Sequence, residues 1–216
     1  MTGLELKPGA PLHIVCIGAH SDDAEIGAAG TVLHLVKLHP ASHVRWIVLS
    51  STPERADEAR ESASTLLSDF LEPEILVFDF RDGFLPYQGM AVKEAFESLK
   101  GGPAPDVIFT HAHTDLHQDH RLAAELTWNT WRDNLILEYE IPKYDGDLAR
   151  PGVYVPLSQD IVNVKLDHLE RNFASQRSKP WYDRETFQGL MRLRGLECRA
   201  PSGYAEAFQA RKLVLD

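Results

Sequence analysis

The chain has 216 residues, of which 44% are hydrophobic and 25% charged, so it can bury a core without disulfides and is too apolar to be disordered. Its 22 basic and 32 acidic residues give a net charge of −10, and the absence of any basic run argues against nucleic acid as a partner. No apolar stretch approaches the roughly 18 residues of a membrane span, and the first ten residues lack a secretory pattern, so we expect a cytoplasmic protein without membrane contact.

Short apolar runs alternate with amphipathic stretches over the first 140 residues. Hydrophobic periodicity and turn residues predict, in chain order, a strand at 12–18, a helix at 27–38, a strand at 44–49, a helix at 53–71, a strand at 74–78, a helix at 91–99, a strand at 106–110, a helix at 119–131 and a strand at 135–139. This alternation predicts an α/β fold with a mainly parallel sheet and helices on both faces. In such a sheet, functional groups gather beyond the carboxyl ends of the strands.

The alternation breaks after residue 140. Proline and glycine punctuate residues 140–158, where we expect a loop and an edge strand at 153–157, followed by helices at 161–174 and 184–193. We predict a single domain over 1–216, with an α/β body at 1–140 and a C-terminal subdomain at 141–216 that shapes the substrate pocket. The sequence leaves the oligomeric state open, and a homo-oligomer is compatible with it.

Acidic residues and a histidine crowd together directly after the first predicted strand. His20, Asp22, Asp23 and Glu25 fall within six residues. Adjacent carboxylates beside an imidazole repel one another unless something compensates them, and a divalent cation is the simplest compensation. The alternative is structural: Asp22 or Asp23 would cap the following helix, with Glu25 in the capping-box position.

A second cluster follows the fourth predicted strand. Six of the ten residues at 111–120 are His or Asp. His117 and His120 are three residues apart, which places them on one face where a helix begins. If strands one and four are neighbours, this cluster and the first one project into the same crevice.

The two clusters together predict a metal site made of His20, Asp23 and His120. Two histidines and one carboxylate with an open position suit a catalytic zinc ion. Asp22 and His117 then remain for proton transfer and oxyanion stabilisation.

Both clusters resemble the motifs of a known enzyme family. Residues 18–27 read GAHSDDAEIG and resemble the A-H-P-D-D-x-E-x-G motif of the PIG-L/LmbE family of zinc-dependent N-deacetylases. Residues 115–121 read DLHQDHR and resemble that family's second motif, D-x-H-x-D-H-R. The resemblance extends to about residue 140. Ser21 stands where the family usually has proline, and because serine can cap the same turn we expect little loss.

The resemblance implies a Rossmann-like fold and a zinc-dependent hydrolase that removes the acetyl group from an N-acetylglucosamine unit of a small molecule or glycoconjugate. Fe²⁺ or another divalent ion could replace Zn²⁺. Carried over by motif position, the metal ligands are His20, Asp23 and His120. The catalytic residues carried over are Asp22 as general base, a protonated His117 beside the oxyanion, and Asp119, which orients His117.

Arg55 follows the second predicted strand, at the same edge of the sheet. The corresponding segment of the family tends to carry a substrate-binding arginine, so Arg55 is predicted to contact sugar hydroxyls or a phosphate. The alternative is a solvated helix face.

Three other functions remain open at this point. An amidase of the same family would cleave a larger acyl amide, and a non-catalytic sugar-binding module would bind without releasing acetate. Two histidines and a carboxylate also form the triad of non-haem iron oxygenases, which acetate release without oxygen consumption would exclude.

Overall fold

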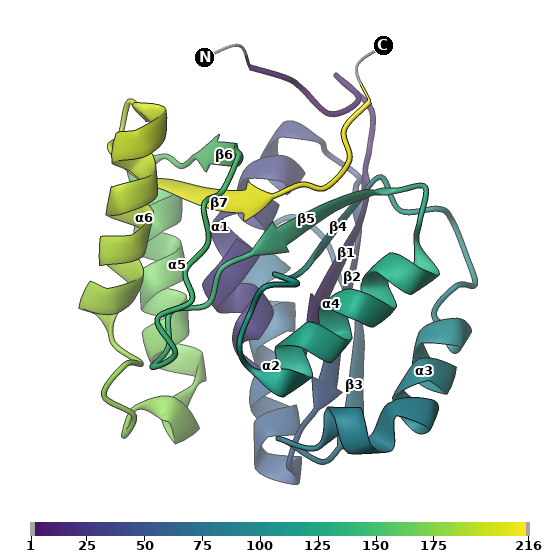
Figure 1. Ribbon diagram of the computed structural model, residues 1–216. Coiled ribbons are helices and arrows are strands. Elements are labelled where there is room, and N and C mark those ends of the chain that lie inside the picture. Colours follow the sequence, from purple (N-terminus) through teal and green to yellow (C-terminus); the bar gives the residue numbers. More distant parts are fainter. Residues whose placement is uncertain (1–2, 215–216) are drawn as a thin grey trace.

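Seven strands form one sheet in the order β3-β2-β1-β4-β5-β7-β6 in the computed structural model, which describes residues 3–214 (Figure 1). The strands are β1 (His13–Gly18), β2 (His43–Ser50), β3 (Glu74–Phe80), β4 (Val107–His111), β5 (Leu135–Tyr139), β6 (Val153–Pro156) and β7 (Ala205–Gln209). Strands β1 to β5 are parallel, whereas β7 runs antiparallel to both β5 and β6. The predicted α/β fold with a mainly parallel sheet is confirmed.

Six α-helices and two short 3₁₀ helices connect these strands in the part of the chain described. They are α1 (Asp23–Leu38), α2 (Pro53–Leu67), η1 (Leu85–Gln88), α3 (Gly89–Ser98), α4 (Gln118–Thr130), α5 (Gln159–Asn172), η2 (Ala174–Gln176) and α6 (Arg184–Cys198). Helix α1 begins four residues before the predicted start, and α2 ends four residues before the predicted end. Strand β7 was not predicted, because its five residues include the buried Glu206, which interrupts the apolar pattern of a core strand.

The two faces of the sheet carry separate hydrophobic cores. Alternate residues of β1 point to opposite faces, so Ile14 and Cys16 join one core while Val15 and Ile17 join the other. The first core includes residues of α1, α2, α5 and α6, and the second includes residues of α3 and α4. The helices therefore cover both faces of the sheet, as Figure 1 shows.

Strands β1 and β4 are direct neighbours, with Ile14 opposite Val107 and Cys16 opposite Phe109. The connection from β1 leads to β2 on one side, and β4 and β5 follow on the other. The strand order therefore reverses between β1 and β4, which is where a sheet of this type opens a crevice at its carboxyl edge.

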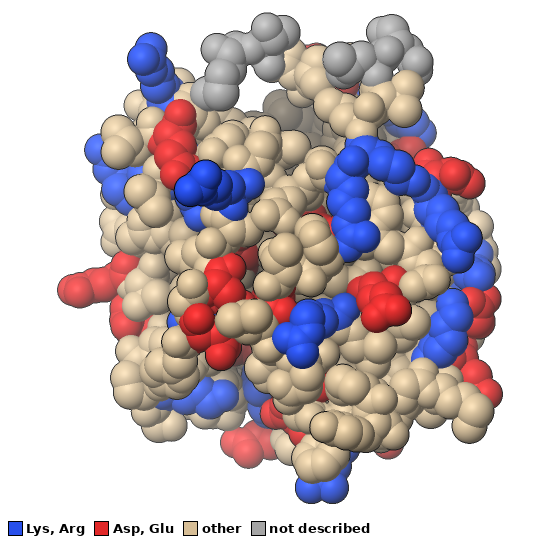
Figure 2. Space-filling model, viewed as in Figure 1, with Lys and Arg blue, Asp and Glu red and all other residues tan. Residues whose placement is uncertain are grey.

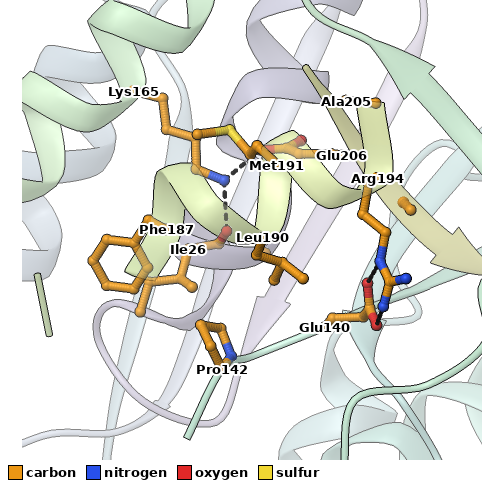
Figure 3. Close-up of a pocket in the computed structure, with 12 residues that line it drawn as sticks. Ile26, Glu140, Pro142, Lys165, Phe187, Leu190, Met191, Arg194, Ala205 and Glu206 are labelled. Carbon is orange, nitrogen blue, oxygen red and sulfur yellow. Dashed lines mark hydrogen bonds and ion pairs between the residues drawn. The ribbon is translucent and has the colours of Figure 1, made fainter. Parts of the chain in front are cut away.

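A buried ion pair links the C-terminal part of the chain to α1. Lys165 Nζ lies 2.5 Å from Glu206 Oε1 and donates to the Ile26 carbonyl at 2.6 Å. The Glu206 carboxylate accepts from the backbone N–H groups of Gly30 and Thr31 at 2.9 and 2.7 Å. Figure 3 shows the pair beside a cavity of about 20 Å³, room for about one water. The pair thus fixes α5 and β7 against the helix that begins at Asp23.

A second buried polar chain joins α1, α2 and α5. Ser62 Oγ donates to Glu25 Oε1 at 2.6 Å and lies 2.9 Å from His168 Nε2. Asn172 Nδ2 lies 3.1 Å from His168 Nδ1. Glu25 therefore serves this chain rather than a capping box, and the Asp22 side chain makes no capping hydrogen bond.

Because His168 is buried in this chain of hydrogen bonds, the stability of the protein depends on pH through the protonation of this residue. Burial, followed by the positive charge of Arg171, lowers the pKa of His168 to about 4. The unfolded chain, with a His pKa of about 6.5, binds the proton more readily than the folded one, so stability is complete above that pH and falls as the pH drops towards 4. We expect a loss of about 2 kcal/mol between pH 7 and pH 5 from this residue. Urea unfolding of the wild type and of His168→Gln at both pH values measures it. An equal loss in both proteins would contradict the assignment.

Gly27 lets α1 pack directly on β5. A Cβ atom at this position would lie 2.3 Å from Cδ2 of the fully buried Tyr139 ring. We expect Gly27→Ala to destabilise the fold by about 1–3 kcal/mol, because the ring has no free space to move into. Gly189→Ala is the matched control, since its Cβ would meet nothing within 4 Å on α6. The control should be neutral or gain up to about 1 kcal/mol in chemical denaturation, and equal stability of the two variants would contradict this packing.

Acidic and basic side chains are interspersed over the face of the molecule that Figure 2 shows. Within residues 3–214, no helix combines the length and the apolar character needed to cross a membrane.

Candidate metal centre and active site

The candidate site lies at the carboxyl ends of β1 and β4. The chain leaves β1 at Gly18 and enters α1 at Asp23, so a short turn carries the first cluster. Ser50 holds this turn from β2, because its backbone N–H and its Oγ donate to the Ala19 carbonyl at 2.9 and 2.7 Å. Ser21 does not cap the turn as expected: its Oγ is buried and has no hydrogen-bond partner among the described residues.

The three predicted metal ligands place their donor atoms close together. His20 Nδ1 lies 3.1 Å from His120 Nε2 and 3.2 Å from Asp23 Oδ2. His120 Nε2 lies 3.6 Å from Asp23 Oδ1. Ligands at 2.0–2.2 Å from a tetrahedral zinc ion are about 3.4 Å apart. With one or the other Asp23 oxygen as donor, these spacings are compatible with a divalent ion, and His117 and His111 lie within reach of the same donor atoms.

Each of the two rings also faces a carboxylate with its other nitrogen. His120 Nδ1 lies 2.9 Å from Asp115 Oδ2, and His20 Nε2 lies 3.1 Å from Asp82 Oδ1 and 3.4 Å from Asp119 Oδ2. Histidines that bind metals usually donate their second ring N–H to such a carboxylate, which fixes the ring and its tautomer. The outer contacts thus leave His20 Nδ1 and His120 Nε2 facing the shared centre.

The electrostatics of the cluster favour a cation. Burial, followed by the nearby His111, lowers the pKa of His120 to about 4, so its ring is neutral at pH 7. Burial raises the pKa of Asp23, but His120, His111 and His20 outweigh it and bring the pKa well below its usual range. Burial lowers the pKa of His20, yet the surrounding carboxylates, led by Asp23, outweigh it and raise the pKa well above the ordinary value. The carboxylates around His20 thus stabilise positive charge at that ring, while the neutral His120 ring keeps a lone pair that can bind a cation.

His111 is a third buried imidazole in contact with this cluster. It stacks on His120 with ring centroids 3.9 Å apart, and its Nε2 lies 3.1 Å from Asp23 Oδ2. The same Nε2 accepts the backbone N–H of Ala19 at 2.9 Å. Because this bond uses the nitrogen lone pair, His111 is a weaker candidate for a metal ligand than His20 or His120.

Asp22 forms an ion pair with Arg55 in the same cavity. Arg55 Nη2 lies 2.5 Å from Asp22 Oδ1, and both side chains are largely buried. Burial raises the pKa of Asp22, and the positive charge of Arg55 offsets only part of that rise. Asp22 Oδ2 has no hydrogen-bond partner among the described residues. Arg55 therefore does not lie on a solvated helix face: it holds one oxygen of Asp22 and leaves the other free.

His117 is the residue before α4 and caps that helix. Its Nδ1 accepts the backbone N–H of Asp119 at 3.3 Å, which assigns the ring proton to Nε2. Burial, followed by the charge of His20, lowers the pKa of His117. A half-buried ring beside another imidazole disfavours the charged form, so these surroundings favour a neutral His117, whereas the sequence led us to expect a protonated one.

The Asp119 carboxylate does not contact the His117 ring as expected. It accepts from the backbone N–H groups of Gly83 and Leu85 at 2.7 and 3.1 Å, and its Oδ2 faces His20. Asp119 thus anchors the loop after β3 to the start of α4, and its closest ring in the site is His20 rather than His117.

A cavity of about 260 Å³ opens above these residues. Its floor contains the predicted ligands, Asp22, Arg55 and His117. The C-terminal part of the chain supplies one wall, and the residues from that part are Ile141, Lys143, Tyr144, Asp145, Gln176, Lys179 and Trp181.

Four residues of the site were not assigned a role from the sequence. Asp82 follows the carboxyl end of β3 and could have been found by the rule that located the other clusters. Asp115 lies inside the second motif, and Lys143 Nζ contacts its Oδ2 at 3.0 Å. Lys143 and Gln176 lie in irregular segments without periodicity, so no sequence signal placed them.

Comparison with known proteins identifies relatives of this chain. A family model described as PIG-L, GlcNAc-PI de-N-acetylase, matches residues 15–131, which is more than half of the chain and includes both motifs. No curated protein sequence matches.

Solved structures with the same fold span nearly the whole chain. The conserved protein TT1542 from Thermus thermophilus is 22% identical with a TM-score of 0.72, covering 95% of this chain and 97% of that one. N,N'-diacetylchitobiose deacetylase from Pyrococcus horikoshii is 18% identical with a TM-score of 0.67, covering 95% and 86%. GalB, the 4-carboxy-2-hydroxymuconate hydratase from Pseudomonas putida, is 16% identical with a TM-score of 0.72, covering 95% and 98%. Their named activities differ, so these likenesses establish the fold and not the reaction.

Proposed function

Because the chain belongs to the PIG-L family of GlcNAc-PI de-N-acetylases, we propose that it is a metal-dependent hydrolase that removes the acetyl group from an N-acetylglucosamine unit of a small molecule or glycoconjugate. One observation carries this proposal. The buried donor atoms of His20, Asp23 and His120 meet at zinc-like spacing, directly beside the free carboxylate oxygen of Asp22.

His20, Asp23 and His120 would hold the ion, with Asp115 and Asp119 supporting the two rings from outside. A divalent cation bound there supplies Lewis-acid activation of water and of an amide carbonyl. Nitrogen and carboxylate ligands suit Zn²⁺, and the same set accepts Fe²⁺ or another divalent ion.

Asp22 is the proposed general base. Asp22 lines the cavity and its Oδ2 has no partner among the described residues, while Arg55 fixes Oδ1 and so sets the direction of the carboxylate. Burial raises the pKa of Asp22 towards the range in which a carboxylate accepts and returns a proton readily. It takes a proton from the attacking water as the new C–O bond forms.

His117 is the proposed oxyanion donor. With Nδ1 occupied by the Asp119 backbone, its Nε2–H is free to donate to the oxygen of the tetrahedral intermediate. The C–N bond then breaks, and the leaving amine takes the proton that Asp22 accepted from the water, while the neutral His117 only donates a hydrogen bond.

The cavity supports a small amino-sugar substrate. Its volume of about 260 Å³ lies just below the range of about 300–1,000 Å³ for ligand pockets, as suits a small ligand. The exposed Tyr144 and the half-buried Trp181 line it and offer flat apolar surfaces, which suit a sugar ring. The segment 141–216 would thus shape the substrate pocket of a single domain. The name of the Pyrococcus horikoshii relative, a deacetylase of a diacetylated disaccharide, supports the same class of substrate.

An acetate-release screen tests this proposal. Protein loaded in turn with Zn²⁺, Fe²⁺, Mn²⁺ or Co²⁺ is incubated with free, nucleotide-linked and glycosidic N-acetylglucosamine, and acetate is quantified. We expect release from at least one conjugate, and loss of release after chelation. Sugar binding without release would instead indicate a binding module. Release of a longer fatty acid but not of acetate, from matched N-acyl sugars, would indicate an amidase.

A further inference from the structure

Gln176 lines the substrate cavity and carries an unsatisfied polar atom. It is the last residue of η2, is 3% exposed and lines the cavity together with Asp22 and Arg55. Its Oε1 is buried and has no hydrogen-bond partner among the described residues. A buried acceptor without a hydrogen bond destabilises the folded protein, because its desolvation is not compensated. A ligand that donates a hydrogen bond to it removes this free-energy cost.

A chain of hydrogen bonds fixes which end of this amide is free. The Glu58 carboxylate accepts the backbone N–H of Ser175 at 2.9 Å and its Oγ–H at 2.6 Å. Because the Ser175 hydroxyl proton is used on Glu58, its oxygen can only accept, and it does so from Gln176 Nε2 at 2.9 Å. The relay from Glu58 through Ser175 therefore orients the Gln176 amide and leaves Oε1 as the free acceptor.

Helix α2 orients two polar groups that line the cavity, the Arg55 guanidinium and the Gln176 amide. Arg55 and Glu58 are three residues apart on α2, so they lie on one face of that helix. Arg55 holds Asp22 and carries only donors, whereas Glu58, through Ser175, orients the Gln176 amide so that Oε1 is its unpaired acceptor. The cavity is thus lined by two different hydrogen-bonding groups whose orientations are fixed.

We propose that Gln176 is a specificity-determining residue, whose Oε1 accepts a hydrogen bond from one hydroxyl of the sugar that carries the acetamide. This inference rests on the proposed deacetylase function. A sugar ring carries hydroxyl donors close to its acetamide, and a site built around a buried acceptor discriminates strongly against an analogue that lacks the donor.

The test combines enzyme variants with substrate analogues. The probes are N-acetylglucosamine and its 3-, 4- and 6-fluoro analogues, in which fluorine replaces a hydroxyl and cannot donate. For the wild type we expect one analogue to lower kcat/KM by about 10- to 100-fold. In Gln176→Met, which keeps the length of the side chain, the penalty for that analogue should shrink to about 3-fold or less, while the other analogues behave as in the wild type.

Two further variants separate recognition from folding. In Glu58→Gln, Gln176 stays in place, but the side chain at position 58 can donate to Ser175 as well as accept from it. The orientation of the Gln176 amide is then no longer fixed, so the discrimination against the same fluoro analogue should weaken. Glu61→Gln, on an exposed position of α2, is the matched control and should keep the wild-type pattern. An unchanged analogue pattern in Gln176→Met would overturn the inference.

Calorimetric binding of the same sugars to Asp22→Asn and to Asp22→Asn/Gln176→Met, both metal-loaded, distinguishes this inference from the proposed function. Analogue-selective binding without acetate release in the wild type would overturn the deacetylase proposal and leave the role of Gln176 standing. Acetate release by the wild type, with the same analogue-binding pattern in Asp22→Asn and Asp22→Asn/Gln176→Met, would do the reverse. Failure of the wild type to bind or deacetylate any of these sugars would overturn both.

Discussion

Replacement of Asp22 by Asn is expected to lower kcat for acetate release by about 10³-fold while the bound metal stays at the wild-type level. General-base catalysis contributes about 10²- to 10⁴-fold, and the amide that replaces Oδ2 cannot take a proton from water. The geometry should survive, because the remaining carbonyl oxygen can still accept from Arg55, which lies 2.5 Å from Oδ1 in the native protein. The side chain does not belong to the group of donor atoms proposed to hold the ion.

Steady-state acetate release and metal analysis by mass spectrometry, on the same preparation, measure this result. Asp57→Asn is the matched control, since Asp57 lies on α2 with a side chain that is 85% exposed. The control should keep both activity and metal. A fully active Asp22→Asn enzyme would show that another group accepts the proton.

Replacement of Asp23 by Ala is expected to remove the metal itself. Loss of a carboxylate that only supports a ligand costs about 10- to 100-fold in metal affinity, so loss of a ligand should cost at least about 100-fold. The His20 and His120 rings would lose the anion that lies 3.2 and 3.6 Å from them. Activity should fall together with the metal content and return in part at high metal concentration.

Metal stoichiometry after dialysis against buffered zinc measures this effect, with circular dichroism as a check on folding. Asp23 Oδ2 also accepts the backbone N–H of His20 at 2.6 Å, so Asp23→Ala could loosen the turn. Asp23→Asn keeps an acceptor for that N–H and separates the two effects, since it should fold normally and still bind metal weakly. Wild-type stoichiometry in both variants would refute Asp23 as a ligand.

The two variants are informative as a pair because the residues are adjacent yet have opposite surroundings. Asp23 lies among three imidazoles, which outweigh burial and bring its pKa well below the usual range. Asp22 lies beside a single arginine, which does not outweigh burial, so its pKa rises. Neighbouring carboxylates with divergent pKa values are typical of sites that divide binding and proton transfer between them.

The sequence alone predicted most of the centre, because both clusters lie in short turns between a strand and a helix. In a parallel sheet such turns share one edge, so the positions of His20, Asp23 and His120 followed once strands one and four were assumed to be neighbours. The register of β1 on β4 confirms that assumption. The family resemblance, which rested on the same residues, is confirmed over 15–131.

Several contacts of the site depend on partners distant in sequence. Arg55, which was predicted to bind substrate, lines the cavity but is paired with Asp22 across 33 residues. Asp119 was predicted to orient His117, and its carboxylate accepts from the loop at Gly83 and Leu85. No local pattern encodes such contacts, because they arise only when separate turns and loops pack together at the carboxyl edge of the sheet.

By itself, then, the sequence determined the family, the parallel sheet and the choice of candidate ligands, since periodicity and turn spacing are local properties that survive without knowledge of packing. The tertiary structure alone decided which groups are buried, which nitrogen of His117 carries the proton, and that the segment after residue 140 supplies Gln176 to the cavity. The physical reason is that desolvation and hydrogen-bond partners depend on every element packed around a group. A chemical role therefore becomes readable only when segments more than a hundred residues apart, such as Glu58 and Ser175, are brought into contact.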